Sequence, residues 1–208
     1  MVPAFNLCII QLQVNFLLII NLKNERSLSE KISKNEITAV ILAGGQASRM
    51  DGEDKGLIVF RELPLISHVI NITKPKVSQI LISANRNFEE YANFGKVIRD
   101  DLKGFQGPLA GISKALKVCS TPYLLVLPCD SPLVDASLID SLIEKMEVSK
   151  VDICVAHDGS IMHATFALMK TKLEKNLEDF LEEGGRKMAL WYRPVSYTHL
   201  TLPTILLV

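Results

Sequence analysis

The stretch that decides the fold is residues 37–56, ITAVILAGGQASRMDGEDKG. Residues 37–42 form a continuous apolar run, rich in β-branched side chains, which predicts a strand covered on both sides. Two adjacent glycines, Gly44 and Gly45, follow this run, and the cations Arg49 and Lys55 come next. Glycines let backbone N–H groups approach phosphate oxygens, and the cations neutralise negative charge. The stretch therefore predicts a loop that wraps a polyphosphate.

The glycine pair has a second interpretation. The loop matches neither the GxxxxGK[ST] pattern of a Walker loop nor the GxGxxG pattern of a dinucleotide-binding turn. It is therefore also compatible with an ordinary strand-to-helix turn that carries two surface cations. The order in which Arg49 and Lys55 follow the glycines favours the phosphate loop.

The chain up to residue 193 alternates the patterns of strands and helices. Apolar runs predict further strands at residues 79–83, 96–98, 123–127 and 152–156. Helical periodicity predicts helices at residues 65–72, 109–118, 137–147 and 173–182. This alternation indicates an α/β fold, a three-layer sandwich with helices on both faces of a mostly parallel, Rossmann-like sheet. Ligands of such sheets bind beyond the carboxyl ends of the strands, so we expect convergence of the loops at Ala43, Asn85, Asp100 and Asp130.

One of these loops begins with a carboxylate directly after an apolar strand. Asp130 lies between two prolines that restrict the backbone. Mg²⁺ prefers one or two carboxylates together with water and substrate oxygens, so Asp130 is a candidate ligand that would hold Mg²⁺ against phosphates. The alternative is an aspartate that caps the following turn through its own side chain. Asp100 and Asp101 would add a second carboxylate, bind a ribose hydroxyl, or simply carry solvated loop charge.

Composition narrows the classes of function. The chain has 208 residues, the length of one ordinary domain, and its 23 Lys and Arg residues balance 23 Asp and Glu residues. Proteins that bind nucleic acid or an anionic membrane usually carry an excess of positive charge, and the formal net charge of zero gives this chain none. The four cysteines form no CxxC pair and have no histidine at metal-ligand spacing. We therefore expect reduced thiols in a cytoplasmic protein, and no thiolate catalysis.

The two ends differ in composition from residues 36–193, which we expect to form the folded domain. Residues 1–35 are expected to be a leader and linker outside the fold, because they lack the basic start and cleavage pattern of a secretory signal. Five amide side chains in residues 1–22 argue against a membrane span. Residues 194–208, PVSYTHLTLPTILLV, resemble translated sequencing-adapter read-through. We expect a foreign tail there and, as a consequence, an unpaired sheet edge.

Short motifs spread over residues 37–193 carry a family resemblance. They are LAGG at 42–45, RM at 49–50, DKGL at 54–57, SANR at 83–86, GPLAG at 107–111, PCD at 128–130, HDG at 157–159, HAT at 163–165 and GGR at 184–186. Taken together and in this order, they resemble the molybdenum cofactor guanylyltransferase family, whereas LAGG with RM and DKG is shared in looser form by other nucleotidyltransferases. The resemblance implies a fold like that of the nucleotide-diphospho-sugar transferases.

The resemblance also implies an activity. Members of this family are nucleotidyltransferases that join GMP from GTP to the molybdenum-molybdopterin cofactor and release pyrophosphate, with Mg²⁺ as the metal. In the family, a Gly-Gly pair after the first strand goes with GTP rather than CTP, and Gly44 and Gly45 match it. The implied partners are GTP, the molybdenum cofactor, and proteins of cofactor synthesis and molybdoenzyme maturation.

Position by position, the resemblance implies roles for individual residues. Lys55, Arg49 and Asp130 are the candidate catalytic residues, and Asp130 is the candidate Mg²⁺ ligand. The candidate nucleotide-binding residues are Leu42, Ala43, Gly44, Gly45, Lys55, Ser83, Asn85, Asp100 and Asp130. The molybdopterin is expected near the His157 and His163 loops and Arg186.

Other functions remain compatible with the same residues. A cytidylyl- or sugar-nucleotide transferase of the same superfamily would differ in the nucleotide and the acceptor that it uses. A catalytically inactive nucleotide-binding module would bind GTP without releasing pyrophosphate. Asp51 stands where relatives have a glycine after Arg-Met, which brings an anion close to the phosphates and predicts weaker GTP affinity.

Overall fold

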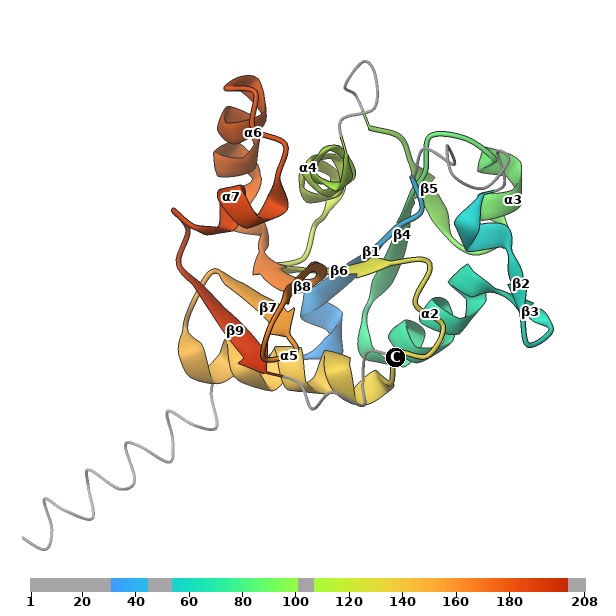
Figure 1. Ribbon diagram of the computed structural model, residues 1–208, viewed down its shortest axis with the longest axis horizontal. Helices are drawn as coiled ribbons and strands as arrows, with labels where there is room; N and C mark the ends of the chain where they lie inside the picture. Colours follow the sequence, from blue (N-terminus) through green and yellow to red (C-terminus); the bar gives the residue numbers. More distant parts are fainter. Residues whose placement is uncertain (1–30, 45–53, 101–106, 202–208) are drawn as a thin grey trace, which may run out of the picture. The chain divides into compact units, whose positions relative to one another are not determined.

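A seven-stranded sheet forms the centre of the protein (Figure 1). The computed structural model describes residues 31–44, 54–100 and 107–201, and its elements belong to the compact unit that begins at Ser33. In spatial order the strands are β5 (Lys96–Ile98), β4 (Gln79–Ser83), β1 (Ile37–Leu42), β6 (Tyr123–Pro128), β8 (Met162–Lys170), β7 (Ile153–His157) and β9 (Tyr197–Thr201). Neighbouring strands are parallel except at β8, which runs antiparallel to β6 and β7. The prediction of a mostly parallel α/β sheet is confirmed.

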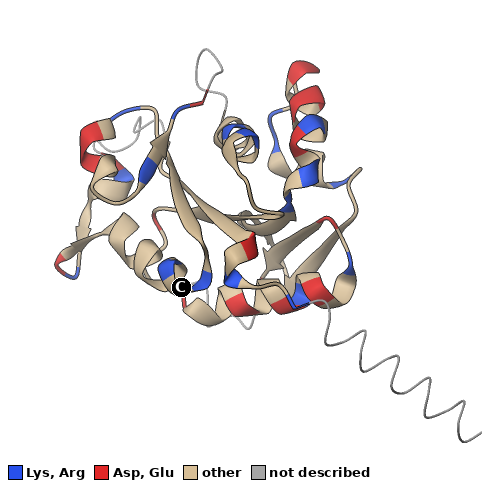
Figure 2. Ribbon diagram, turned by 180° about the vertical axis from the view of Figure 1, so that it is seen from behind, with Lys and Arg blue, Asp and Glu red and all other residues tan. Residues whose placement is uncertain are grey.

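Helices cover both faces of this sheet and make the outer layers of the predicted sandwich (Figure 1). They are α2 (Leu65–Thr73), α3 (Phe88–Ala92), α4 (Pro108–Val118), α5 (Ala136–Ser149), α6 (Glu174–Glu182) and α7 (Met188–Tyr192). α4, α6 and α7 lie on one face, and α2 and α5 lie on the other. A hairpin of β2 (Val59–Phe60) and β3 (Leu63–Pro64) and a 3₁₀ turn, η2 (Lys55–Leu57), precede α2. Figure 2 shows charged residues mainly on the helices and loops, as expected for a covered sheet.

β1 lies in the middle of the sheet, between β4 and β6, and its sequence explains this position. The apolar residues of the run from Ile37 to Ile41 are fully buried. A parallel strand that is covered on both faces needs apolar side chains pointing both ways, and this run supplies them. Thr38 is the polar residue of the run, and its hydroxyl accepts a hydrogen bond from Thr121 Oγ1 at 2.9 Å.

α4 and α5 begin at recognisable helix-start signals. Pro108 occupies the first turn of α4, where a missing N–H removes no helical hydrogen bond. Gly107, just before it, has a φ of +73°, which a residue with a side chain rarely adopts. The Asp135 carboxylate accepts a hydrogen bond from Ser137 N at 2.8 Å and caps α5. From its start at Pro108, α4 packs against the strands β1 and β4.

Two strands of the sheet differ from the sequence prediction. We expected residues 163–165 in a loop, but they lie in β8. β8 escapes detection as an apolar run because residues 162–165 are only partly buried and include polar side chains. Residues 197–201 form β9, which pairs in parallel with β7 along its whole length. The expected unpaired sheet edge is therefore wrong for β7, because residues of the suspected tail return alongside it after α7.

A cluster of buried residues fills the space between the sheet and α4, α6 and α7. Trp191 and Tyr192 of α7 are fully buried in it. Trp191 Nε1 donates a hydrogen bond to Asn176 Oδ1 at 2.8 Å, which ties α7 to α6. Within the described ranges, the helices include none that is both long and apolar enough to cross a membrane.

Candidate active site

Backbone hydrogen bonds draw the carboxyl ends of the central strands together. Ala43 N donates to Ser83 O at 2.8 Å, just after the end of β1. Cys129 N donates to Leu42 O at 3.2 Å, just after the end of β6. These bonds continue the parallel ladders of β1 with β4 and β6. The predicted convergence of the strand ends is confirmed, because the residues that follow them line two adjoining cavities.

The larger cavity, with a volume of about 240 Å³, carries an ion pair in its wall. Lys55 Nζ lies 3.4 Å from Asp130 Oδ2, so two residues from distant parts of the chain meet here. Their side chains are 57% and 39% exposed, which leaves both charges accessible to a ligand. Arg86 adds a second cation to the lining. The lining also includes the Asp54 carboxylate, which pairs with Arg86, so Lys55 and Asp130 are the accessible charges. An accessible cation beside an accessible carboxylate suits a phosphate ligand that carries a divalent cation.

Residues 42–44 line the same cavity, where we expected the first part of the nucleotide-binding loop. Of these, Leu42 and Gly44 also line the smaller cavity described next. The remaining loop residues of the prediction, Gly45, Arg49 and Asp51, lie outside the described residues, and so does Asp101. Their contribution to the site stays a prediction.

A smaller cavity, of about 30 Å³, shares part of its lining with the larger one. Its polar residues are Ser83, Asn85 and Asp100, which we expected to meet the base or the ribose. Asn85 Nδ2 donates a hydrogen bond to Asp100 Oδ2 at 2.6 Å. A carboxylate that is oriented in this way presents acceptors for hydroxyl or amino groups of a ligand. The structure thus brings these three residues together beside the ion pair.

The approach of α4 to the end of β4 at this cavity depends on Gly111. A Cβ atom at this position would clash with Ser83 Oγ and lie 3.4 Å from Leu42 Cδ2. A larger residue would push the first turns of α4 away from both strand ends. From the sequence alone, Gly111 has no assigned role beyond its place in the GPLAG motif, because a close contact between a helix and a strand has no local signal beyond the glycine itself.

Asp54, directly before Lys55, is a site residue that the sequence analysis missed. Its side chain is 3% exposed. It accepts hydrogen bonds from Tyr91 Oη at 2.5 Å, Arg86 Nε at 3.1 Å and Asn87 Nδ2 at 3.2 Å. These donors compensate the cost of burying a carboxylate. Burial and the hydrogen bond to Asp54 raise the pKa of Tyr91 far above its ordinary value, so the hydroxyl stays a donor.

Cys129 lies between the end of β6 and Asp130 and is 6% exposed. Burial, and after it the charge of Asp130, raises the pKa of its thiol to about 12. A thiol with a pKa this high is mainly protonated at neutral pH, which disfavours Cys129 as a nucleophile. Cys119, Cys129 and Cys154 are free, as expected for reduced thiols, and Cys8 lies outside the described residues.

The donor set of the site suits a metal that brings its own oxygen ligands. In the described part of the chain, no three His, Cys, Asp or Glu side chains gather in a way that could hold a metal ion. Asp130 is a single accessible carboxylate at an open cavity. This fits Mg²⁺, which takes one or two carboxylates and completes its shell with water and phosphate oxygens.

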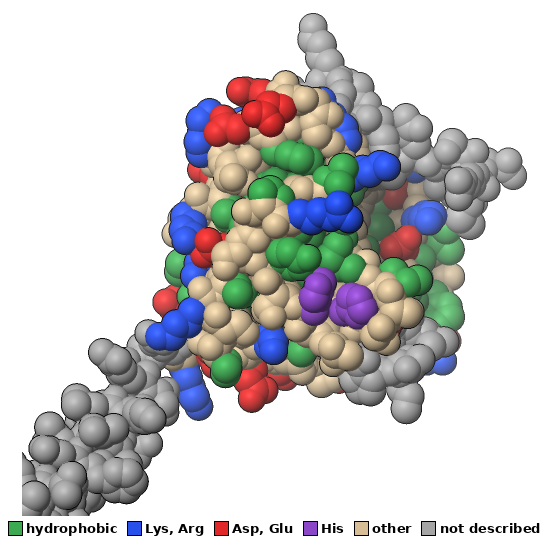
Figure 3. Space-filling model, turned by 60° about the vertical axis from the view of Figure 1, so that its left-hand side comes forward, with side chains coloured by type: hydrophobic (Ala, Val, Ile, Leu, Met, Phe, Trp, Pro, Cys, Tyr) green, Lys and Arg blue, Asp and Glu red, His purple; other side chains and the backbone are tan. Residues whose placement is uncertain are grey.

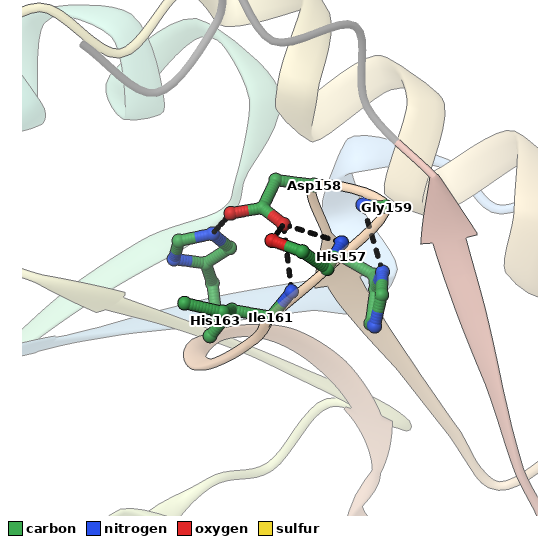
Figure 4. A network of polar contacts seen from close by, with 6 residues as sticks. His157, Asp158, Gly159, Ile161 and His163 are labelled. Carbon is green, nitrogen blue, oxygen red and sulfur yellow. Dashed lines mark hydrogen bonds and ion pairs between the residues drawn. The ribbon is translucent and has the colours of Figure 1, made fainter.

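The turn between β7 and β8 holds a separate polar network (Figure 4). The Asp158 carboxylate accepts hydrogen bonds from Ile161 N at 2.7 Å and Ser160 N at 2.8 Å. His163 Nε2 lies 2.8 Å from the other oxygen of Asp158. The backbone N–H of Ile161 makes the largest contribution to lowering the pKa of Asp158 well below its usual range. The turn is thus held by its own residues.

The residues predicted near the molybdopterin do not line the two cavities. His157, His163 and Arg186 are absent from both linings, whereas Thr165 of β8 reaches the larger one. Arg186 Nη1 donates to a backbone carbonyl at the end of α6 at 2.8 Å. The rings of His157 and His199 are in contact, with centroids 5.1 Å apart. Figure 3 shows histidine side chains grouped beside hydrophobic ones on an exposed face.

Comparison with known proteins identifies close relatives. A family model described as MobA-like NTP transferase domain matches residues 39–195. The molybdenum cofactor guanylyltransferase of Shewanella putrefaciens is 46% identical over 166 residues, which cover 79% of this chain and 85% of that protein. The protein of the same name from Shewanella sediminis is 45% identical over 158 residues, which cover 76% of this chain and 81% of that protein.

Solved structures share the fold at low sequence identity. Molybdopterin-guanine dinucleotide biosynthesis protein A from Archaeoglobus fulgidus superposes with a TM-score of 0.65 at 20% identity, over 80% of this chain and 83% of that one. A CMP:2-keto-3-deoxy-manno-octonic acid synthetase complexed with CTP gives a TM-score of 0.61 at 13% identity, over 82% and 90%. The predicted likeness to nucleotide-diphospho-sugar transferases is confirmed for the fold. With a family model that spans most of it and relatives at this identity, the chain belongs to the MobA-like NTP transferase family.

Proposed function

We propose that the chain is a molybdenum cofactor guanylyltransferase. It transfers GMP from GTP to the molybdenum-molybdopterin cofactor, which forms the guanine dinucleotide cofactor and releases pyrophosphate. Relatives at 46% and 45% identity carry this name. The observation that carries the proposal is that Lys55, Asp130 and residues 42–44 meet at one open cavity. Such a cavity offers cations to phosphates and a carboxylate to a divalent cation.

The reaction needs no covalent nucleophile from the protein. A terminal phosphate oxygen on the pterin side chain attacks the α-phosphorus of GTP, and a new P–O bond forms. The bond between the α-phosphorus and the oxygen that bridges to the β-phosphorus breaks, and pyrophosphate leaves with that electron pair, opposite the attacking oxygen. The protein contributes positioning and charge neutralisation. The protonated, buried Cys129 thiol agrees with this division of work.

Lys55 has the central role in charge neutralisation. Its ammonium group contacts the nucleotide phosphates and offsets the charge that grows on the leaving pyrophosphate. Arg49 and Gly45 are proposed for the same phosphate cradle on the strength of the family resemblance. Leu42, Ala43 and Gly44, at the end of β1, line the same phosphate-binding site. The exposure of the Lys55 side chain, 57%, supports this role because a buried ammonium could not reach a ligand.

The polar residues of the smaller cavity are proposed to bind the nucleoside part of GTP. Asp100, oriented by Asn85, would accept hydrogen bonds from ribose hydroxyls or from the base. Ser83 borders the same space. The molybdopterin is proposed to approach from the side of His157, His163 and Arg186. A cytoplasmic location and contacts with cofactor-synthesis and molybdoenzyme-maturation proteins are part of the same proposal.

Mg²⁺ is proposed as the metal and Asp130 as its protein ligand. When bound, Mg²⁺ supplies Lewis-acid neutralisation of phosphate oxygens. The Asp130 carboxylate is accessible, and one of its oxygens pairs with Lys55 at 3.4 Å. This long ion pair keeps the two charges balanced in the free protein, and the incoming nucleotide provides new partners for both.

A pyrophosphate-release assay tests the proposal. The purified chain is incubated with Mg²⁺ and either GTP or CTP, with and without molybdenum-loaded molybdopterin. We expect release only when GTP and the acceptor are both present. Release with CTP in place of GTP would identify a cytidylyltransferase. Mg²⁺-dependent GTP binding without any release would identify an inactive nucleotide-binding module.

A further inference from the structure

Lys55 and Asp130 each have a buried neighbour in the chain, and these neighbours lie close together. Gly56 follows Lys55, and Cys129 precedes Asp130. A Cβ atom on Gly56 would lie 3.2 Å from Cys129 Sγ and 2.5 Å from Tyr91 Oη. The backbone after Lys55 is therefore enclosed between a thiol and a tyrosine hydroxyl, with no room for a side chain.

Tyr91 also contacts the residue on the other side of Lys55. Its hydroxyl donates a hydrogen bond to Asp54 Oδ1 at 2.5 Å. Tyr91 is fully buried and the Asp54 side chain is only 3% exposed, so this contact is shielded from solvent. One hydroxyl group thus holds both chain neighbours of Lys55, Asp54 by a hydrogen bond and Gly56 by packing.

The Asp54 carboxylate divides its two oxygens between different donors. Arg86 Nε and Asn87 Nδ2 contact Oδ2 at 3.1 Å and 3.2 Å, whereas Tyr91 contacts Oδ1. Without the tyrosine hydroxyl, a buried carboxylate oxygen loses this donor, which is costly for a charged group in a shielded place. We expect the carboxylate then to rotate toward its other donors and, because Asp54 precedes Lys55 directly, the change to reach the backbone of Lys55.

We propose that Tyr91 is a positioning residue, and that its hydroxyl sets the Lys55 ammonium group opposite Asp130 through its contacts with Asp54 and Gly56. The consequence for catalysis rests on the proposed function, whereas the position of Lys55 can be measured without turnover. A tyrosine that served only to pack α3 would stabilise the protein but would leave the pair of Lys55 and Asp130 unchanged when its hydroxyl is removed.

Nuclear magnetic resonance of the full chain, with lysines labelled as ¹³C-dimethyl groups, measures this position. The Lys55 signal is assigned by its loss in Lys55→Arg, and Asp130→Asn is expected to move it, because Asp130 lies 3.4 Å away. In Tyr91→Phe we expect the Lys55 signal to shift and to lose its response to Asp130→Asn. A Lys55 signal that stays in place and keeps the full response would overturn the proposal.

Tyr192→Phe is the matched control. Tyr192 is also fully buried, and its hydroxyl donates to Ala164 O at 2.8 Å, so this change removes the same atom from a different part of the core. We expect Tyr192→Phe to lower the melting temperature by about as much as Tyr91→Phe does, but to leave the Lys55 signal unchanged. Equal changes of the Lys55 signal in both variants would contradict a specific role of Tyr91.

A second variant covers the case in which Tyr91→Phe does not fold. Asp54→Asn keeps the shape of the side chain but removes the charge that Arg86 and Tyr91 hold. It is expected to uncouple Lys55 from Asp130 in the same way. A Lys55 signal in this variant that responds to Asp130→Asn as in the unaltered chain would overturn the proposal.

Turnover separates this proposal from the proposed function. At saturating Mg²⁺ and GTP, a displaced Lys55 is expected to lower kcat in Tyr91→Phe by about ten- to a hundredfold, since a small misplacement of a catalytic group has an effect of this order. An active parent chain with an equally active Tyr91→Phe variant would overturn the positioning role. A parent chain without pyrophosphate release contradicts only the proposed function, and the Lys55 signal then decides the role of Tyr91.

Discussion

The wall of the larger cavity and the turn between β7 and β8 both depend on a hydrogen-bonded carboxylate, but they are assembled differently. In the turn, the partners of Asp158 lie within five positions of it. At the cavity, Asp54 binds Tyr91, 37 positions later, and Lys55 pairs with Asp130, 75 positions later. The turn network therefore needs only its own residues, whereas the cavity wall exists only when β1, β4 and β6 are in register.

This difference predicts two kinds of mutational effect. A change at the cavity should alter ligand binding and turnover, because it disturbs contacts between segments that only the fold brings together. A change in the turn should affect the stability of that turn and leave the nucleotide cavity as it is, since none of the residues of the Asp158 network lines it. The following three variants test this contrast, from the largest expected effect to the smallest.

Asp130→Ala should have the largest effect. We expect turnover to fall by about 10²-fold or more, roughly 3 kcal/mol of barrier, because the site loses its proposed metal ligand. The melting temperature should stay close to that of the unaltered chain, since the side chain is 39% exposed. Pyrophosphate release at saturating Mg²⁺ and GTP measures the first effect, and thermal unfolding measures the second.

Asp140→Ala provides the control for this variant. Asp140 also pairs with a lysine, Lys76, at 2.7 Å, but on a surface away from the cavity. Its loss should leave turnover unchanged. Unaltered rates in Asp130→Ala would show that the metal assignment is wrong, and equal losses in both variants would show that the cavity has no special role.

Gly111→Ala should destabilise the protein by about 1–3 kcal/mol, because the new methyl group overlaps Ser83 Oγ and forces α4 away from the strand ends. GTP binding should weaken as well, since Ser83 lines the smaller cavity. Urea unfolding and GTP titration measure the two effects.

Gly95→Ala is the control, because its methyl group would meet its nearest neighbour at an ordinary contact distance of 3.4 Å. Equal urea midpoints for both variants would rule out the need for close packing at Gly111.

Asp158→Asn should have the smallest effect, and the effect should depend on pH. The pKa of Asp158 is lowered in the folded protein, first by the backbone N–H of Ile161. The ionised carboxylate therefore stabilises the fold above its unfolded pKa of about 3.9, and this contribution is lost as the pH falls below that value. The difference in melting temperature between the unaltered chain and Asp158→Asn should be larger at neutral pH than near pH 3. A difference that is constant with pH would contradict the assignment, and GTP affinity should be equal in both proteins.

Local sequence patterns predicted the strands that are continuous apolar runs and the helices that have a periodic apolar face. The strands at residues 79–83 and 96–98 match β4 and β5 in their bounds. Four helices, α2, α4, α5 and α6, were predicted to within a few residues at their ends, because each has an apolar face at helical spacing. The short helices α3 and α7 were not predicted, because five residues are too few to show a helical period. β8 was missed because half of it is partly exposed and carries polar side chains, so it has no uniform apolar pattern.

The sequence by itself determined that a buried strand leads into a glycine loop, that lysine and aspartate follow strand ends, and that such ends meet at one edge of a parallel sheet. The first two features can be read from residues that are neighbours in the chain, and the third is a general property of parallel sheets. Only the tertiary structure decided that Lys55 faces Asp130, that Tyr91 holds Asp54, and that β9 covers the edge of β7. Contacts of this kind depend on register and on close packing between distant segments, and no short stretch of sequence contains that information.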